Sequence, residues 1–134
     1  MIVYRKGYSA YVDTSVVDFT DFLPTLASIA NIPLPTDYGI LDGTVFYPQK
    51  STRQWIFCDY EPHPEKKHGD TLRWVQNSTY KRYGAQLTDT VRQNKLYNII
   101  ADPYEKTPIT RSKQTPYEKY IDSTFKAVLK TMHD

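Results

Sequence analysis

The feature that most constrains the fold is a series of short β-type runs in the middle of the chain. Residues 53–62, 70–84 and 94–100 are rich in aromatic and β-branched residues, and turn or loop residues separate them. The tetrapeptide from Asn77 to Tyr80 supplies a turn inside the second run. We therefore predict a small antiparallel sheet of about four strands, which needs a cover on one face.

The last segment of the chain predicts the helix that covers this sheet. Thr115 and Glu118 form a Thr-x-x-Glu capping box, and Pro116 takes the first helical position. An apolar stripe with helical spacing follows, made of Tyr117, Ile121, Phe125, Val128 and Met132. The sheet and this helix together predict an α+β fold for residues 51–134.

Residues 1–50 have a different character. Met1 to Tyr4 form a short apolar run typical of a strand, and residues 18–32 predict a helix with Pro24 in its first turn. We expect Asp21 to cap the first free amides of that helix. One helix face is apolar, formed by Phe22, Leu26, Ile29 and Ala30. Because a lone strand needs neighbours to pair its backbone, this part resembles the edge of a larger domain.

Composition excludes several classes of function. Seventeen basic and 15 acidic residues give a net charge of +2, too balanced for a nucleic-acid surface. The sequence has no signal-peptide pattern and no apolar run long enough to cross a membrane, so we expect a soluble chain without a membrane partner. The single cysteine cannot form an internal disulfide. The 12 tyrosines fit either a surface for sugars or partner proteins, or half-buried positions on a small sheet.

The most site-like stretch is residues 58–70, which hold the cysteine, two of the three histidines and four carboxylates. The prolines that flank His63 force an extended path, and no helical spacing aligns His63 with His68, so we expect a loop of solvated charges and no metal site. Cys58 lacks a third group that would orient a neighbouring histidine, and we expect it to pack as a small apolar side chain within a strand.

Three segments resemble, in order, the C-terminal part of sulfatases. In the helix expected at residues 18–32 and the loop that follows it, the matching residues are Asp21, Pro24, Thr25, Leu26, Asp42 and Gly43. A strand pair matches through Arg73, Val75, Tyr80 and Lys81, and a closing segment through Leu96, Tyr97, Asp102, Pro103, Glu105 and Pro108. Asn98 and Asn31 depart from the usual Asp and Gly, although Asn also adopts the left-handed cap conformation. The chain is thus identified as similar to the C-terminal part of an arylsulfatase-like member of the alkaline-phosphatase superfamily.

The resemblance implies that the catalytic machinery lies outside this sequence. Sulfatases hydrolyse sulfate esters with a formylglycine made from Cys or Ser in a Cys/Ser-x-Pro/Ala-x-Arg motif, assisted by calcium. Cys58 lacks the Pro/Ala and the Arg of that motif. We therefore expect no catalytic residue and no metal ligand in this chain, which alone is inactive. Calcium and formylglycine are implied for the longer parent enzyme, and such parents are commonly periplasmic, secreted or lysosomal.

The resemblance also implies a role for residues 58–70 as a loop that borders the substrate pocket. In that reading His63 contacts the substrate away from the sulfate, by a hydrogen bond or by charge when protonated. Lys66, Lys67 and His68 add positive charge that suits sulfated, acidic sugars. These four residues are the candidate substrate-binding residues.

The sequence therefore predicts a truncated sulfatase. Residues 1–50 form the C-terminal edge of its α/β domain, and residues 51–134 form its C-terminal subdomain. The expected partners are the remainder of the sulfatase chain, a sulfated carbohydrate and further copies of this chain, because the apolar face of the first helix is left uncovered. Two alternatives stay open: the C-terminal part of a related phosphoesterase or phosphonate hydrolase, and a stand-alone module that binds carbohydrate or protein.

Overall fold

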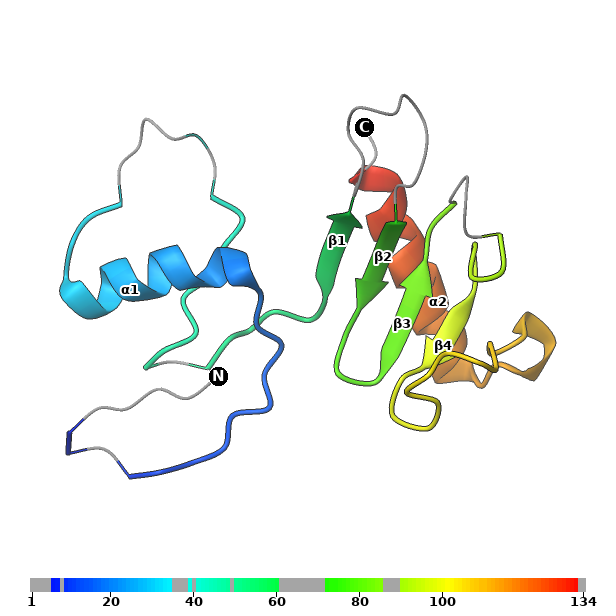
Figure 1. Cartoon of the computed structure of the whole chain (residues 1–134), viewed down its shortest axis with the longest axis horizontal. Coiled ribbons are helices and arrows are strands. Elements are labelled where there is room, and N and C mark those ends of the chain that lie inside the picture. The colour runs from blue at the N-terminus through cyan, green and yellow to red at the C-terminus, as the bar shows by residue number, and fades with distance from the viewer. Residues whose placement is uncertain are drawn as a thin grey trace.

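Figure 1 shows the computed structural model of the chain, which describes residues 6–7, 9–34, 39, 41–48, 50–60, 72–85 and 90–132. The elements in order are η1 (Phe19–Asp21), α1 (Phe22–Ala30), β1 (Ile56–Tyr60), β2 (Leu72–Gln76), β3 (Tyr80–Tyr83), β4 (Leu96–Asn98), η2 (Arg111–Lys113) and α2 (Pro116–Thr131). The strand expected at Met1 to Tyr4 lies outside the described residues. None of the helices within the described ranges is long and apolar enough to cross a bilayer.

The four strands form one antiparallel sheet in the order β1-β2-β3-β4. Phe57 pairs with Val75, Val75 with Arg82, and Arg82 with Leu96, so these four residues lie in one row across the sheet. The turn between β2 and β3 is held by Asn77, whose Oδ1 accepts hydrogen bonds from the backbone amides two and three residues further on. The predicted meander is confirmed, because every strand of the sheet pairs with its neighbour in sequence.

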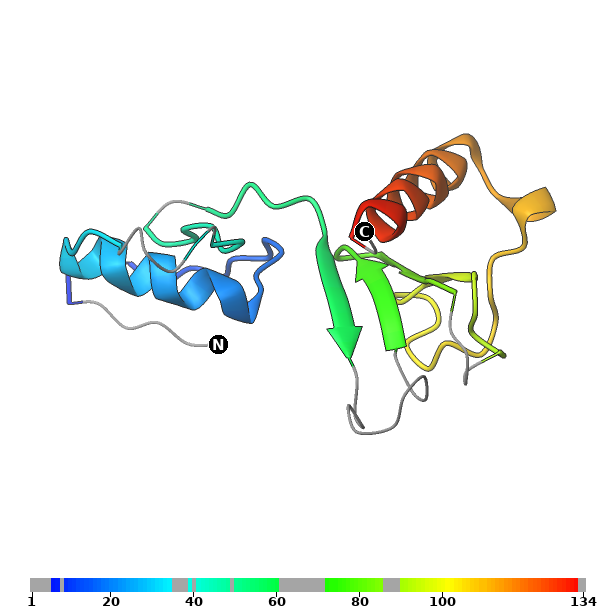
Figure 2. The same ribbon diagram turned by 90° about the horizontal axis from the view of Figure 1, so that it is seen from above.

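Helix α2 crosses one face of the sheet (Figure 2) and contacts β2 and β3. Thr115 caps it through the predicted capping box, with Pro116 at its start. The core between helix and sheet consists of Val75, Tyr80, Leu96, Ile121 and Phe125. The predicted stripe is wrong at both ends, since Tyr117 is 59% and Met132 48% exposed. The sheet is shorter than the 16-residue helix, and its contact is centred on Ile121 and Phe125.

A charged pair lies inside the same interface. The Arg82 guanidinium on β3 donates to the Asp122 carboxylate on α2, and both side chains are only 6% exposed. Lys126 adds a second cation, with its Nζ 2.9 Å from Asp122 Oδ2. A buried carboxylate is tolerated only when it is paired, so this contact fixes how α2 sits on the sheet.

Helix α1 begins differently from the prediction. Asp21 does not cap its amides, because its backbone is already helical (φ −76°, ψ −15°) and a capping residue needs an extended backbone. The cap is Asp18, which precedes the 3-10 turn η1 and is extended (φ −117°, ψ 164°). At the other end, Asn31 adopts the left-handed conformation (φ 54°) that the sequence allowed for it.

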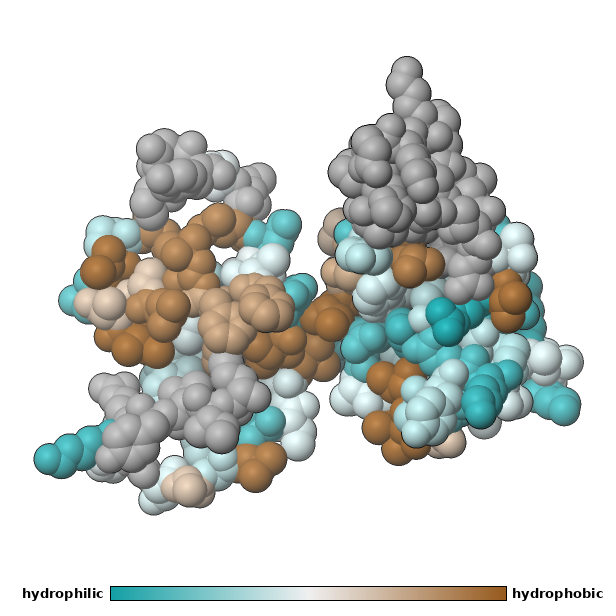
Figure 3. All heavy atoms as spheres, in the orientation of Figure 1, coloured by the Kyte–Doolittle hydropathy of each residue, from teal (hydrophilic) through white to brown (hydrophobic). Residues whose placement is uncertain are grey.

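Hydrophobic side chains gather on the surface over α1 (Figure 3). Five large ones are between 45% and 88% exposed: Phe19, Leu23, Leu26, Ile29 and Ile32. We call this set the α1 apolar surface. The buried side of the helix is formed instead by Pro24 and Thr25, which face the segment after the helix. Leu26 and Ile29 lack a cover, as expected, but Phe22 of the same predicted face does not, because it is half-buried against the ring of Phe46.

Replacing Phe125 with Ala should lower the free energy of unfolding by roughly 3–5 kcal/mol, because it leaves a cavity under the centre of α2. Urea titration followed by the fluorescence of Trp74, on β2, measures the change. The matched control is Met132→Ala at the C-terminal cap of the same helix, where loss of an exposed side chain should cost less than about 0.5 kcal/mol. Equal losses for the two variants would contradict the core assignment.

Candidate functional site

The four candidate substrate-binding residues, His63, Lys66, Lys67 and His68, lie outside the described residues. Both ends of their segment are described. Tyr60 and Leu72 are the last residue pair of the β1–β2 ladder, and Asp59 Oδ2 lies 2.9 Å from Arg73 Nε one pair earlier. Residues 61–71 therefore leave and rejoin the sheet at one corner, which a cross-strand ion pair holds together.

Cys58 lies in β1 opposite Trp74 and is half-buried. Burial raises the pKa of its thiol, and the negative charges of Asp18 and Asp59 raise it further. At neutral pH the group is therefore a thiol, whereas nucleophilic attack requires the thiolate. This environment supports a packing role for Cys58 within the strand.

The face of the sheet opposite α2 carries a polar and aromatic cluster around Glu105. Lys81 Nζ lies 2.7 Å from Glu105 Oε1, and the Tyr83 hydroxyl donates to Oε2 of the same carboxylate. The ammonium of Lys81 also lies 4.8 Å from the ring centroid of Trp74 and 4.7 Å from that of Tyr83. Glu105 itself takes a left-handed backbone (φ 55°) in the loop after β4. The cluster thus ties this loop to β3.

A second buried carboxylate, Asp21, joins three segments of the N-terminal part. It has no exposed surface. Its Oδ1 accepts from the Thr44 amide at 2.7 Å and from Arg53 Nη2 at 2.5 Å, and its Oδ2 accepts from the Asp18 amide at 2.8 Å. Burial raises the pKa of Asp21, but the hydrogen bonds from Arg53, Asp18 and Thr44 outweigh it and hold the pKa below its ordinary value.

Gly43 and Thr25 complete the same junction. A Cβ on Gly43 would lie 1.9 Å from the Thr20 carbonyl oxygen, so only glycine fits. The Thr25 hydroxyl donates to the Asp21 carbonyl and accepts from the Phe46 amide. The residues that carry the sulfatase resemblance here therefore serve packing and hydrogen bonding. Sequence reasoning found these positions but missed Arg53, which lies 32 residues from its partner.

The described residues do not fit the calcium implied for the parent enzyme. No cluster of three or more His, Cys, Asp and Glu side chains within the described ranges could hold a metal ion. The buried carboxylates are each paired with a cation, Asp21 with Arg53 and Asp122 with Arg82. Calcium takes six to eight oxygen ligands, and carboxylates whose charge is already balanced by an arginine are poor ligands for it.

Comparison with known proteins finds likenesses among solved structures. No protein-family model and no curated protein matches the sequence. Among solved structures, the chain is similar to the crystal structure of a "putative sulfatase" from Bacteroides thetaiotaomicron VPI-5482, with a TM-score of 0.55 and 23% identity. The match covers 83% of this chain and 23% of that one. The chain therefore shares a sulfatase-like fold over about a quarter of the length of the Bacteroides protein.

Asp21→Asn should lower the free energy of unfolding by about 3 kcal/mol, because it leaves the Arg53 guanidinium partly buried without its counter-charge. Thermal or urea unfolding measures the loss. Asp42→Asn is the control, since it changes the same residue type at an exposed side chain in the same junction. A loss equal to that of the control would contradict the structural role of the pair.

The same pair predicts a pH dependence. A carboxyl whose pKa is depressed on folding contributes stability that is complete above its ordinary value of 3.8 and is lost as the pH falls through the lower folded-state pKa. The acid limb of the stability profile should therefore be shallower in Asp21→Asn than in the unsubstituted chain. Parallel acid limbs below pH 4 would count against this assignment.

Proposed function

We propose that this chain is the C-terminal region of a sulfatase-type sulfuric ester hydrolase, where it completes the fold and lends residues 61–71 to the rim of the substrate pocket. The observation that carries the proposal is the shared fold with the Bacteroides protein over 83% of this chain. The order of the sulfatase-like motifs supports the same conclusion. The formylglycine nucleophile and the calcium ligands come from the rest of the enzyme, so this chain alone has no hydrolase activity.

The α1 apolar surface supports a covering partner. Five large side chains on one short helix and its flanks are too many for an isolated surface, where such patches mark interaction sites. The sheet and α2, in contrast, bury a core of their own. We propose that the remainder of the sulfatase chain covers α1, and that in its absence copies of this chain associate through the same surface.

The β1–β2 corner supports the proposed pocket rim. The Asp59–Arg73 pair holds the two ends of residues 61–71 together, so the loop is presented from a fixed base. His63 contacts the substrate away from the scissile ester, and Lys66, Lys67 and His68 attract an acidic sugar. A phosphoesterase of the same superfamily would use this region in the same way, and the upstream nucleophile distinguishes the two.

Self-association can be tested on the chain itself. We expect light scattering to report oligomers for the unsubstituted chain and a monomer for the double variant Leu23→Gln, Leu26→Gln, because the change removes apolar area from the α1 apolar surface. The control is Ile100→Gln, a more exposed apolar residue in the turn after β4. A monodisperse monomer before any substitution would overturn the prediction.

The pocket-rim role requires the longer enzyme. There, His63→Ala should raise KM for the sulfated substrate by roughly tenfold with little change in kcat, since it removes a contact made equally in ground and transition states. Lys106→Ala is the control, because this exposed lysine follows β4 and rests beside Tyr104. Unchanged kinetics for His63→Ala would rule out the proposed contact. Hydrolysis of 4-nitrophenyl sulfate by residues 1–134 alone would refute the proposal that the rest of the enzyme supplies the nucleophile.

A second candidate function is a stand-alone carbohydrate-binding module. The observation that favours it is a pair of exposed tyrosines on α2, Tyr117 and Tyr120, with ring centroids 6.5 Å apart. Exposed aromatic rings with polar tips suit the faces of sugar rings. Saturable binding of a neutral glycan by the isolated chain, lost in Tyr120→Ala, would favour this function over the first.

A further inference from the structure

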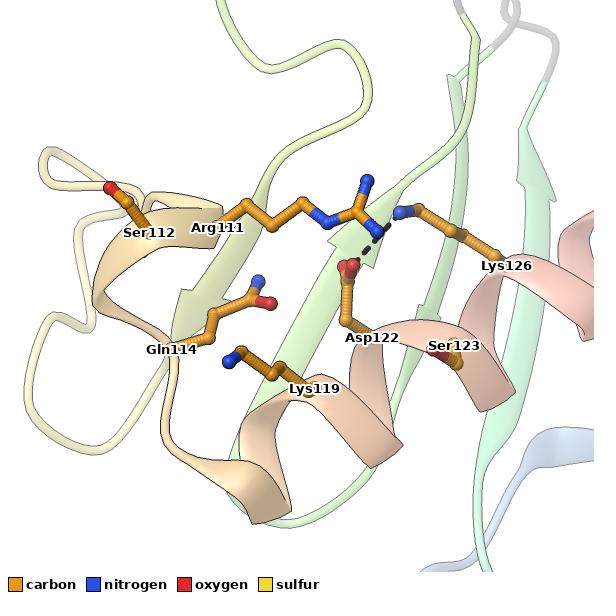
Figure 4. A pocket seen from close by; sticks show the side chains of 7 residues that line it. All are labelled: Arg111, Ser112, Gln114, Lys119, Asp122, Ser123 and Lys126. Atoms are coloured by element: carbon orange, nitrogen blue, oxygen red, sulfur yellow. Dashed lines mark ion pairs between the residues drawn. The ribbon is translucent and has the colours of Figure 1, made fainter.

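A pocket of about 540 Å³ lies between the 3-10 turn η2 and the first turns of α2 (Figure 4). It is lined by Arg111, Ser112, Gln114, Lys119, Asp122, Ser123 and Lys126. The lining comes from two segments that meet at a turn, so the fold creates the hollow. None of these residues belongs to the candidate substrate-binding loop.

The pocket has a surplus of positive charge. Arg111, Lys119 and Lys126 face one acidic lining residue, Asp122. That carboxylate is already paired twice, with the Arg82 guanidinium beneath it and with Lys126 Nζ at 2.9 Å. Its charge is therefore neutralised from inside the protein, whereas Arg111 and Lys119 have no ion-pair partner among the described residues. An anion entering the pocket meets cations that nothing else satisfies.

Gln114 gives the pocket a buried polar donor. The residue is only 8% exposed and lines the pocket. Figure 4 shows this amide turned toward the ends of Arg111 and Asp122, with Lys126 beside them and Lys119 further out. A side-chain amide in the wall of a cationic hollow adds a neutral hydrogen-bond donor for an anionic ligand.

We propose that this pocket binds an oxyanion carried on a small organic group, such as a sulfate or phosphate ester. The Arg111 guanidinium offers a planar pair of donors to two ester oxygens, and the Gln114 amide and Lys126 ammonium supply further donors. The volume exceeds what an inorganic ion fills and suits a ring-sized group attached to the anion. The inference is independent of the proposed function, because it rests on residues between Arg111 and Lys126 alone.

Isothermal titration of the full chain at low salt tests the site, with glucose 6-sulfate, glucose 6-phosphate and inorganic sulfate as probes and glucose as the neutral control. We expect saturable binding of at least one ester and none of glucose. Arg111→Gln and Gln114→Ala should each weaken that binding roughly tenfold. The matched control is Lys113→Gln, which removes a charge from the same turn but does not line the pocket, and it should leave the affinity within about twofold.

The relative affinities of the esters and of inorganic sulfate, together with the response of the variants, identify the ligand of the pocket. If inorganic sulfate binds as tightly as the esters and the Arg111 and Gln114 variants still lose affinity, the oxyanion site stands and its ligand is the free ion. If the control Lys113→Gln weakens binding as much as Arg111→Gln and Gln114→Ala do, only the general positive charge of the region attracts the probe, and the site is refuted. Absence of saturable binding by all three anions also refutes it. Arg111 is exposed, so Arg111→Gln tests the charge without disturbing the fold.

Discussion

The ion pair between Asp21 and Arg53 is the interaction on which the arrangement of the N-terminal part depends. The Asp21 carboxylate, which has no exposed surface, accepts hydrogen bonds from the backbone amides of Asp18 and Thr44 and from the Arg53 guanidinium. These bonds join the turn before α1, the loop after α1 and the segment that leads into β1. The close approach of Gly43 to the Thr20 carbonyl is possible only because this junction holds the loop against the helix. An ion pair of this kind adds little net stability compared with an apolar core, but its directional bonds specify one geometry.

The C-terminal part contains two further ion pairs of this kind, on opposite faces of one sheet. Asp122 pairs with Arg82 beneath α2, and Glu105 pairs with Lys81 on the other face. In each case a carboxylate from a helix or loop meets a cation of β3. In these pairs the charge of each carboxylate is balanced by a neighbouring cation. We propose functional roles for the corner where β1 and β2 end, for the α1 apolar surface and for the cationic pocket beside α2.

Local patterns were enough to predict the meander, the capping box of α2 and the left-handed residue at the end of α1, because each depends on residues within one or two turns of chain. Contacts between distant residues were not accessible in this way. Arg53 is an ordinary basic residue until the fold brings it to Asp21, and the Lys81–Glu105 pair joins two recognised motifs whose spacing gives no hint of contact. The helical period placed Tyr117 and Met132 on the buried stripe, but it contains no information about how far the sheet extends beneath them. The pocket beside α2 was missed because its residues are typical of a solvated surface.

The order of the sheet has a consequence for how this region folds. Every strand pairs with its neighbour in sequence, so no pairing waits for a distant segment to arrive. The entropy lost in closing such short loops is small, and domains dominated by local contacts fold faster than those with parallel or crossed strands. Before the sheet, the described contacts around Asp21 and Thr25 join residues that lie 21 to 32 positions apart in the sequence. The sheet and α2 should therefore assemble as one rapid unit, and docking of α1 onto the proposed covering partner should be the slower, later step.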